Sequence, residues 1–250
     1  KWLQPGISWS PDGQKIVIAS KSGDADALYL IDIETEKSNK LTFDLDGLFT
    51  ASWSPDGNNL CFIGNRGNAS DIFLYDLKSE TLVNLTNDLF SDSEPVWSPD
   101  GKKIAFVSDR AEHTVKEKDE DWNSLDMFEH DYSQRDIYIL DISTRTIERI
   151  THTDHDETYP VWSHTKKVLF YTSDDQGVWN IVRHDIPTGN IQQITNVLTG
   201  IQQLSLSMDD KSLVFSGYNE GGWDIYTLSY PLESQAFEIE PTNYYVSRNE

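Results

Sequence analysis

Residues 97–101 read Trp-Ser-Pro-Asp-Gly, and the same five residues occupy positions 9–13 and 53–57. The three copies follow one another at a constant step of 44 residues, from 9 to 53 to 97. Degenerate copies open at Trp162 and Leu206, which are again 44 residues apart. The step from 97 to 162 is 65 residues, so the third unit carries an insertion of 21 residues. A period of this size indicates one small structural unit repeated along the chain.

The repeated motif predicts a tight turn between two strands. Pro fixes φ at the second turn position, Asp bonds back to the backbone, and Gly accepts a positive φ. The runs at 103–108 and 136–141 are rich in β-branched and aromatic residues, as half-buried strands are. A Leu-Thr or Ile-Thr pair then marks a last strand in each of the first four units. Four short antiparallel strands per repeat make one blade of a β-propeller, and we expect the repeated Trp to pack between neighbouring blades.

The predicted fold is therefore all-β, a β-propeller of four-stranded antiparallel blades with five repeats in this chain. We interpret residues 1–250 as a single propeller domain or part of one. The blades are expected to start near residues 7, 51, 95, 160 and 204. The insertion is expected at 111–133, between the second and third strands of the third blade. Two closures stay open, a five-bladed ring and a ring of roughly six or more blades with the remainder outside this chain.

Charge narrows the classes of partner. The chain holds 20 Lys and Arg against 42 Asp and Glu, for a formal net charge of −22. Nucleic acid is excluded because phosphate binding needs basic side chains, and anionic membrane surfaces are disfavoured for the same reason. No apolar run approaches the ~18 residues that span a bilayer, so direct membrane insertion is not expected. The net negative charge is compatible with three explanations, namely a cationic partner, a divalent metal or a saline habitat. Cys61 is alone, which rules out an intrachain disulfide, and we expect it to be buried.

The segment 97–110, with 136–141 and the pair at 150–151, resembles the WD-like propeller repeat of TolB and its relatives. The resemblance covers nearly the whole chain. Similar repeats occur in the propeller domains of prolyl-oligopeptidase-type peptidases, tricorn-type proteases and oligogalacturonate lyases. The resemblance implies a propeller that is often periplasmic or otherwise extracytoplasmic in bacteria, often one module of a larger protein, and usually a platform for protein interactions. It also favours the larger ring, because the rings of this family usually have more than five blades.

The connections that lead from one repeat to the next are acidic. In a propeller such connections lie on one face around the central channel, so we expect their carboxylates to converge and to attract a Lys/Arg-rich peptide or a cation. The acidic residues of these connections are Asp44, Asp46, Asp88, Asp92, Glu94, Asp154, Asp156 and Glu157. Of these, Asp92, Glu94, Asp156 and Glu157 are the predicted partner-binding residues.

One of these connections also carries histidines. His152, Asp154 and His155 are metal-capable side chains at loop spacing, although a solvated polar loop is the favoured interpretation. No cofactor is predicted, and a divalent cation such as calcium stays open.

The insertion in the third repeat is highly charged but also contains apolar residues. Trp122, Leu125 and Phe128 recur every three residues, which suits one side of a short helix. Because functional elements concentrate on loops held by rigid scaffolds, these three side chains are predicted to contact a partner. The alternative is an insertion that only packs on its own blade.

Catalytic motifs are missing from the sequence. It contains no Gly-x-Ser-x-Gly, no Gly-rich phosphate loop, no His-Glu-x-x-His and no Cys pair for zinc. The predicted function is a non-catalytic, TolB-like scaffold that binds a protein or a cationic peptide, as one module of a larger extracytoplasmic bacterial protein. The alternative is the propeller domain of an enzyme. That enzyme would be a prolyl-oligopeptidase-type or tricorn-type peptidase with a gating propeller, or a metal-dependent lyase or glycosidase.

Overall fold

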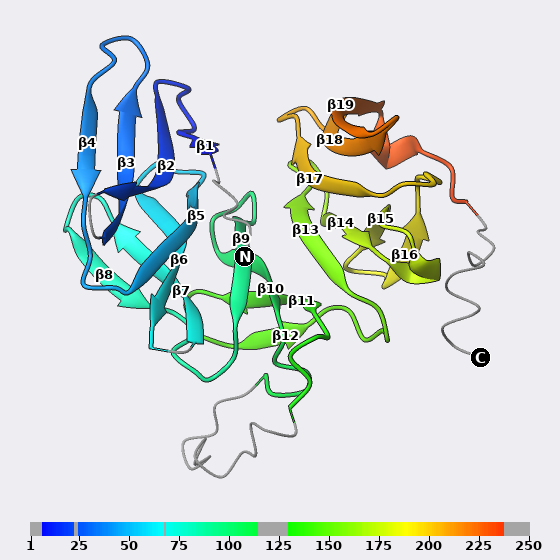
Figure 1. Cartoon of the computed structure of the whole chain (residues 1–250), viewed down its shortest axis with the longest axis horizontal. Helices are drawn as coiled ribbons and strands as arrows, with labels where there is room; N and C mark the ends of the chain where they lie inside the picture. The colour runs from blue at the N-terminus through cyan, green and yellow to red at the C-terminus, as the bar shows by residue number, and fades with distance from the viewer. Residues whose placement is uncertain (1–6, 23–24, 68, 115–129, 238–250) are drawn as a thin grey trace. The chain divides into compact units, whose positions relative to one another are not determined.

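The computed structural model describes residues 7–22, 25–67, 69–114 and 130–237. These residues form five antiparallel sheets, four with four strands and one with three (Figure 1). In every sheet the strands are adjacent in the order in which the chain makes them. The prediction of an all-β propeller of four-stranded antiparallel blades is confirmed. Among the described residues, no helix has the length and apolar character needed to cross a membrane.

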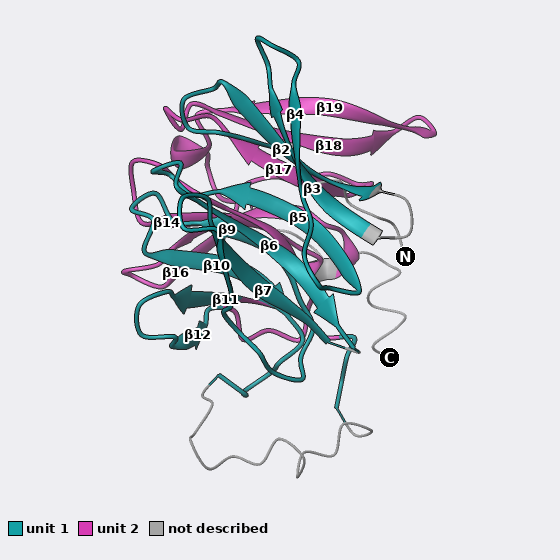
Figure 2. Cartoon of the chain, turned by 90° about the vertical axis from the view of Figure 1, so that its left-hand side faces the viewer, with its two compact units in different colours: residues 1–133, 138–150 teal, residues 134–137, 151–250 magenta. Residues whose placement is uncertain are grey.

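The chain divides into two compact units, coloured in Figure 2. Unit 1 comprises residues 1–133 and 138–150, and unit 2 comprises residues 134–137 and 151–250. The first blade contains β1 (Ile7–Trp9), β2 (Lys15–Ser22), β3 (Ala25–Asp32) and β4 (Ser38–Leu41). The second contains β5 (Gly47–Trp53), β6 (Asn59–Arg66), β7 (Ala69–Asp76) and β8 (Thr81–Asn84). The third contains β9 (Asp92–Trp97), β10 (Lys103–Ser108), β11 (Asp136–Asp141) and β12 (Ile147–Arg149).

Unit 2 holds the fourth and fifth blades. The fourth contains β13 (Glu157–Trp162), β14 (Val168–Ser173), β15 (Asn180–Asp185) and β16 (Asn190–Gln193). The fifth contains β17 (Ile201–Leu206), β18 (Ser212–Asn219) and β19 (Gly222–Ser229). Two short 3-10 turns, η2 (Asp175–Gly177) and η3 (Pro231–Glu233), follow β14 and β19. After η3 the chain returns to the fourth blade, where the backbone N–H of Phe237 donates to the carbonyl of Gln193 at 3.0 Å.

Each unit has its own apolar core between neighbouring blades. In unit 1, Trp53 is buried in the cluster that joins the first two blades, and the indole N–H of Trp97 donates to the carbonyl of Ser52 at 3.2 Å. Trp162 is also buried. The expected burial of the repeated Trp therefore holds at 53 and 162 and in part at 97, which is half-buried. It is wrong for Trp9, which is 57% exposed. Cys61 is buried, as expected.

The repeated turn is closed by its own Ser and Asp. In each full copy the Ser hydroxyl donates to the Asp carboxylate, at 2.6, 2.5 and 2.7 Å in chain order. The Asp also accepts the backbone N–H of the second residue after it. The Gly that follows takes a positive φ, the backbone conformation that favours this residue. The residues concerned are Ser10, Asp12 and Gly13, Ser54, Asp56 and Gly57, and Ser98, Asp100 and Gly101.

The degenerate turn of the fourth blade lacks this Asp and obtains one from the fifth blade. Asp210 is buried, and its carboxylate accepts the hydroxyl of Ser163 at 2.7 Å and the hydroxyl of Thr165 at 2.5 Å. It also accepts the backbone N–H groups of His164 and Thr165, at 2.8 and 2.9 Å. Burial opposes ionisation of Asp210, but these hydrogen bonds outweigh it and lower the pKa of the carboxyl. One side chain thus replaces the missing motif residue and joins two blades.

Replacing Asp210 with Ala should lower the free energy of unfolding by about 1–3 kcal/mol, because it leaves several donors in the turn at 163–165 without an acceptor. Asp209 is the matched control, because its side chain is 58% exposed and bonds only within its own turn. Urea unfolding of Asp210→Ala and Asp209→Ala at pH 7 measures the difference. Equal losses in the two variants would show that Asp210 does not join the blades. Since the folded pKa of Asp210 is lowered, its contribution is present at neutral pH and should fade in acid.

Candidate functional site

The first acidic connection lies between β4 and β5, where Asp44 and Asp46 are exposed. The Asp46 carboxylate accepts the backbone N–H of Gly67 at 2.8 Å, and the Asp44 carbonyl accepts the Arg66 guanidinium at 3.1 Å. Both residues therefore brace the turn between β6 and β7. Asp44 remains a carboxylate on the surface of unit 1.

The second acidic connection is built around a buried arginine. The Arg110 guanidinium pairs with Asp88 at 2.9 Å and with Asp92 at 2.5 Å. Its Nε donates to the Ser108 hydroxyl at 3.0 Å. Arg110 is 1% exposed and Asp92 is 2% exposed. The sequence had indicated an accessible, partner-binding Asp92, and this is corrected: the carboxylate is enclosed because it neutralises Arg110.

Aromatic rings enclose the same guanidinium. Its Cζ lies 5.7 Å from the ring centroid of Phe90, 5.2 Å from that of Phe106 and 5.6 Å from that of Tyr138, which are cation–π distances. Burial raises the pKa of Asp92, and the positive charge of Arg110 acts against that rise. The cluster stabilises the third blade and offers no charge to a partner. Glu94, the other predicted residue of this connection, is half-buried in β9.

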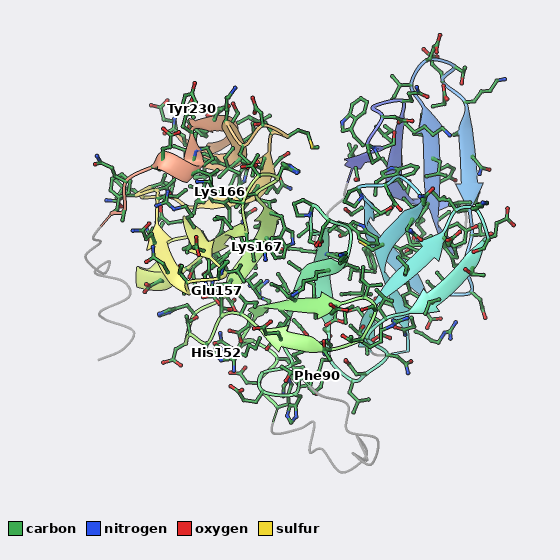
Figure 3. All side chains as sticks on the ribbon, turned by 180° about the vertical axis from the view of Figure 1, so that it is seen from behind. Phe90, His152, Glu157, Lys166, Lys167 and Tyr230 are labelled. Atoms are coloured by element: carbon green, nitrogen blue, oxygen red, sulfur yellow. The ribbon has the colours of Figure 1, made fainter. Side chains whose placement is uncertain are left out.

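The ends of the third-blade insertion pack on Phe90, which is labelled in Figure 3. The ring of His113 stacks on Phe90 at 5.2 Å between centroids, and the ring of His130 lies 5.3 Å away. His130 Nε2 is also 2.7 Å from the carbonyl oxygen of Asp109. The predicted contact residues Trp122, Leu125 and Phe128 lie outside the described residues.

The third acidic connection, before β13, makes hydrogen bonds and an ion pair with neighbouring residues of unit 2. Asp156 pairs with the Arg135 guanidinium at 2.7 Å and accepts the Arg135 backbone N–H at 2.8 Å. His155 Nε2 lies 3.3 Å from a carboxylate oxygen of Asp175. The side-chain amide of Gln134 donates to the His155 carbonyl at 2.5 Å. This connection is therefore an ordered loop, and the carboxylate of Asp156 already has a cation beside it.

Two of the metal candidates, His152 and Asp154, are exposed on that loop. Within the part of the chain that the structure describes, no group of three or more His, Cys, Asp or Glu side chains is arranged to hold a metal ion.

Glu157 is the exception among the acidic residues of this loop, because it is deeply buried where β13 begins (Figure 3). Its Oε1 accepts the hydroxyl of Thr153 at 2.6 Å and that of Ser173 at 3.3 Å. Its Oε2 is buried and has no hydrogen-bond partner. Glu157 is 1% exposed. A polar atom buried in this way costs free energy unless something satisfies it.

Glu157 lines a cavity of about 270 Å³ on one face of the fourth blade. The lining residues are Thr153, His155, Glu157, Tyr171, Ser173, Asp175, Val182, Ile191, Gln193 and Phe237, all from unit 2. Carboxylate and hydroxyl groups come from β13, the end of β14 and the adjoining loops. Apolar and aromatic side chains come from β14, β15, β16 and the segment after η3. The cavity thus places the buried carboxyl group of Glu157 beside an apolar wall.

The environment of Glu157 brings its titration into the physiological range. Burial raises the pKa of Glu157 to about 7, and the negative charge of Asp136 adds to the rise. The hydroxyls of Thr153, Thr151 and Ser173 act in the opposite direction. Burial, with the charge of Glu157, also raises the pKa of Tyr171. The carboxyl therefore changes charge near neutral pH, so a cation that reached Oε2 would favour the ionised form.

Sequence reasoning selected Glu157 as a partner-binding residue and His155 as a metal candidate, but it missed the other residues of the cavity. Tyr171 and Ser173 alternate on β14 in an apolar run that reads as ordinary core. Ser173 is placed beside Glu157 by the register of β13 against β14. Phe237 reaches the cavity only because the chain turns back after η3. Arg110 was visible in the sequence directly after a strand, but nothing in the repeat indicated that it would be buried.

Comparison with known proteins agrees with this architecture. Residues 4–114 match the family described as the TolB beta propeller domain (PD40), so the chain carries a TolB-like β-propeller domain and the expected resemblance is confirmed. No curated protein sequence matches the chain.

Solved structures that share the fold include the following three. TolB from Acinetobacter baumannii has 22% identity and a TM-score of 0.71, covering 90% of this chain and 51% of its own. Putative TolB from Agrobacterium tumefaciens has 19% identity and a TM-score of 0.72, covering 91% of this chain and 77% of its own. An oligogalacturonate lyase in complex with manganese has 16% identity and a TM-score of 0.65, covering 90% and 61%. This chain thus spans about half the length of the Acinetobacter TolB chain.

Proposed function

We propose that this protein is a non-catalytic interaction module that binds a basic protein or peptide, with the Glu157 cavity and its acidic surroundings as the contact surface. The TolB-like propeller domain supports a scaffold role. The same likeness, including that to TolB from Acinetobacter baumannii, supports an extracytoplasmic bacterial setting for the module. The net charge of −22 favours a cationic partner over an anionic one.

The observation that carries the proposal is the unsatisfied carboxylate oxygen of Glu157 in a cavity. A buried ionisable group is costly unless a partner of opposite charge or a hydrogen-bond donor meets it. Asp175 lines the same cavity with a side chain that is 44% exposed, and Asp154 is exposed on the adjoining loop. Their negative potential attracts cations toward the cavity. A basic partner would supply both the charge and the donor that Oε2 lacks.

Calorimetric titration with Lys- and Arg-rich peptides tests the proposal. We expect binding that weakens as salt rises, because charges on the surface are screened over ~10 Å at 0.1 M. Asp175→Asn and Asp154→Asn should each weaken binding by about two- to fivefold, the range of exposed ion pairs. Asp44→Asn, the same change on an exposed loop of unit 1, serves as the control and should leave the affinity unaltered. Salt-independent binding, or an equal loss in the control, would contradict the proposal.

A further inference from the structure

We infer that the cavity beside Glu157 is a binding pocket for an alkylammonium group, the side chain of a lysine presented by the partner. The inference rests on the proposed function for the origin of the lysine. Four features of unit 2 select this ligand.

The first feature is size. The cavity measures about 270 Å³, just below the range of roughly 300–1,000 Å³ typical of pockets for whole small molecules. A cavity of this volume suits a single amino-acid side chain. A cofactor or an oligosaccharide needs more room than the described residues leave.

The second feature is the distribution of polarity. The carboxylate comes from β13, and Tyr171, Val182, Ile191 and Phe237 contribute apolar or aromatic surface on the side of β14 to β16. A lysine has the same two parts, a chain of methylene groups and a charged end. Long basic side chains commonly lay their methylenes along apolar surface in this way. The aromatic ring of Tyr171 is part of this apolar side of the cavity.

The third feature is the number of oxygens that are available. Oε1 of Glu157 already accepts the hydroxyls of Thr153 and Ser173, which leaves Oε2 as the one atom without a partner. A guanidinium binds carboxylates best through two parallel hydrogen bonds, and these need both oxygens. An ammonium is a compact point charge that needs only one. The site therefore favours lysine over arginine.

The fourth feature is the balance of charges around Glu157. Asp175 and His155 line the cavity, with His155 Nε2 at 3.3 Å from a carboxylate oxygen of Asp175. Asp136 lies close enough to act on the carboxyl, and Asp174 and Asp156 lie on the adjoining loops. His184 of β15 is in contact with Tyr171, at 6.2 Å between ring centroids. No Lys or Arg is among the cavity-lining residues described, and Arg135 is engaged with Asp156. No lysine or arginine among these lining residues therefore competes for Oε2.

The test uses the whole chain and the small probe Nα-acetyl-L-lysine methylamide, with the norleucine and arginine analogues as comparisons, followed by NMR titration at pH 8. We expect the lysine probe to bind at least about tenfold more tightly than either analogue, since a hydrogen bond between charged groups is selective at this level. Glu157→Gln should abolish that preference. Glu148→Gln, the same substitution at an exposed residue of β12, should retain it.

The pH dependence keeps the test decisive if Glu157→Gln folds poorly. In the unmodified protein the affinity for the lysine probe should fall about tenfold from pH 8 to pH 6, because the carboxyl becomes protonated across that range. Equal binding of the three probes, or a flat pH profile, would overturn the inference. If Lys/Arg-rich peptides bind and respond to Asp175→Asn but not to Glu157→Gln, binding of a basic partner by the acidic surroundings of the cavity holds, and the lysine pocket at Glu157 fails. If the lysine probe binds while the peptides do not, the lysine pocket holds and the proposed binding of a basic peptide fails.

Discussion

Arg110→Ala is expected to lower the free energy of unfolding by about 3–5 kcal/mol, the usual cost of removing one partner from a buried ion pair. The side chains of Asp88 and Asp92 are 5% and 0% exposed, so two carboxylates would lose their cation without gaining water. Phe90, Phe106 and Tyr138 would also lose the guanidinium against which they pack. Urea unfolding at pH 7.5, combined with amide hydrogen exchange along β9 and β10, measures the loss and locates it in the third blade.

Arg145→Ala is the control for this experiment. Arg145 is an exposed arginine of unit 1 whose guanidinium makes a long contact of 3.4 Å to the Asn84 carbonyl, so its loss should change stability by less than about 0.5 kcal/mol. Acid should also rescue Arg110→Ala in part. Without the guanidinium, burial and the negative charge of Asp88 raise the pKa of Asp92 further, so protonation removes the uncompensated charge as the pH falls. A loss below about 1 kcal/mol at pH 7.5 would show that the pair is not structural.

The repeat made the fold predictable, because each landmark has a local physical cause. Ser, Asp and Gly of the turn motif bond within a few residues of one another, so their spacing reports the turn directly. The β-branched runs on either side of each turn were therefore predicted to be paired strands of similar length. The same reasoning fails at particular places: Ile225 of β19 is 81% exposed, although its position in the repeat is buried at Ile181 and Ile137. Burial depends on the neighbouring blade, and the repeat pattern says nothing of that neighbour.

The site was less predictable because the repeat pattern does not distinguish between acidic residues at equivalent positions. Asp92 and Glu157 are the first residues of β9 and β13 in successive blades, yet Asp92 pairs with Arg110 while Oε2 of Glu157 has no hydrogen-bond partner. The distinction comes from the residue 18 positions downstream, which is Arg110 in the third blade and Asp175 in the fourth. The partner of Asp210 was also not predictable from the repeat, because its carboxylate accepts hydrogen bonds from a turn in the preceding blade. Pairings of this kind are tertiary and leave no periodic trace in the sequence.

Glu157 should make the protein less stable as the pH rises through 7. Its folded pKa of about 7 lies above the usual value of 4.5, so the folded state holds the proton more tightly than the unfolded chain does. The resulting stabilisation is complete below pH 4.5 and is lost as the pH passes 7. A difference of about 2.5 between the two pKa values corresponds to about 3 kcal/mol, an order-of-magnitude figure for a largely buried group.

Glu157→Gln keeps the shape of the side chain and removes the ionisation, so its stability relative to Glu148→Gln should rise by about 3 kcal/mol between pH 4.5 and pH 8.5. The comparison is made by urea unfolding, and because both variants lose one negative charge, the general repulsion within an acidic protein cancels. Parallel pH profiles for the two variants would mean that Glu157 is ionised without strain in the folded protein. The expected difference between the two pH profiles measures the free energy that ionisation of Glu157 costs the folded protein. A bound ammonium can offset this cost, because a ligand that binds only the folded, ionised state stabilises that state. A cation held at Oε2 should therefore raise stability most at pH values above 7, where the vacant carboxylate costs most.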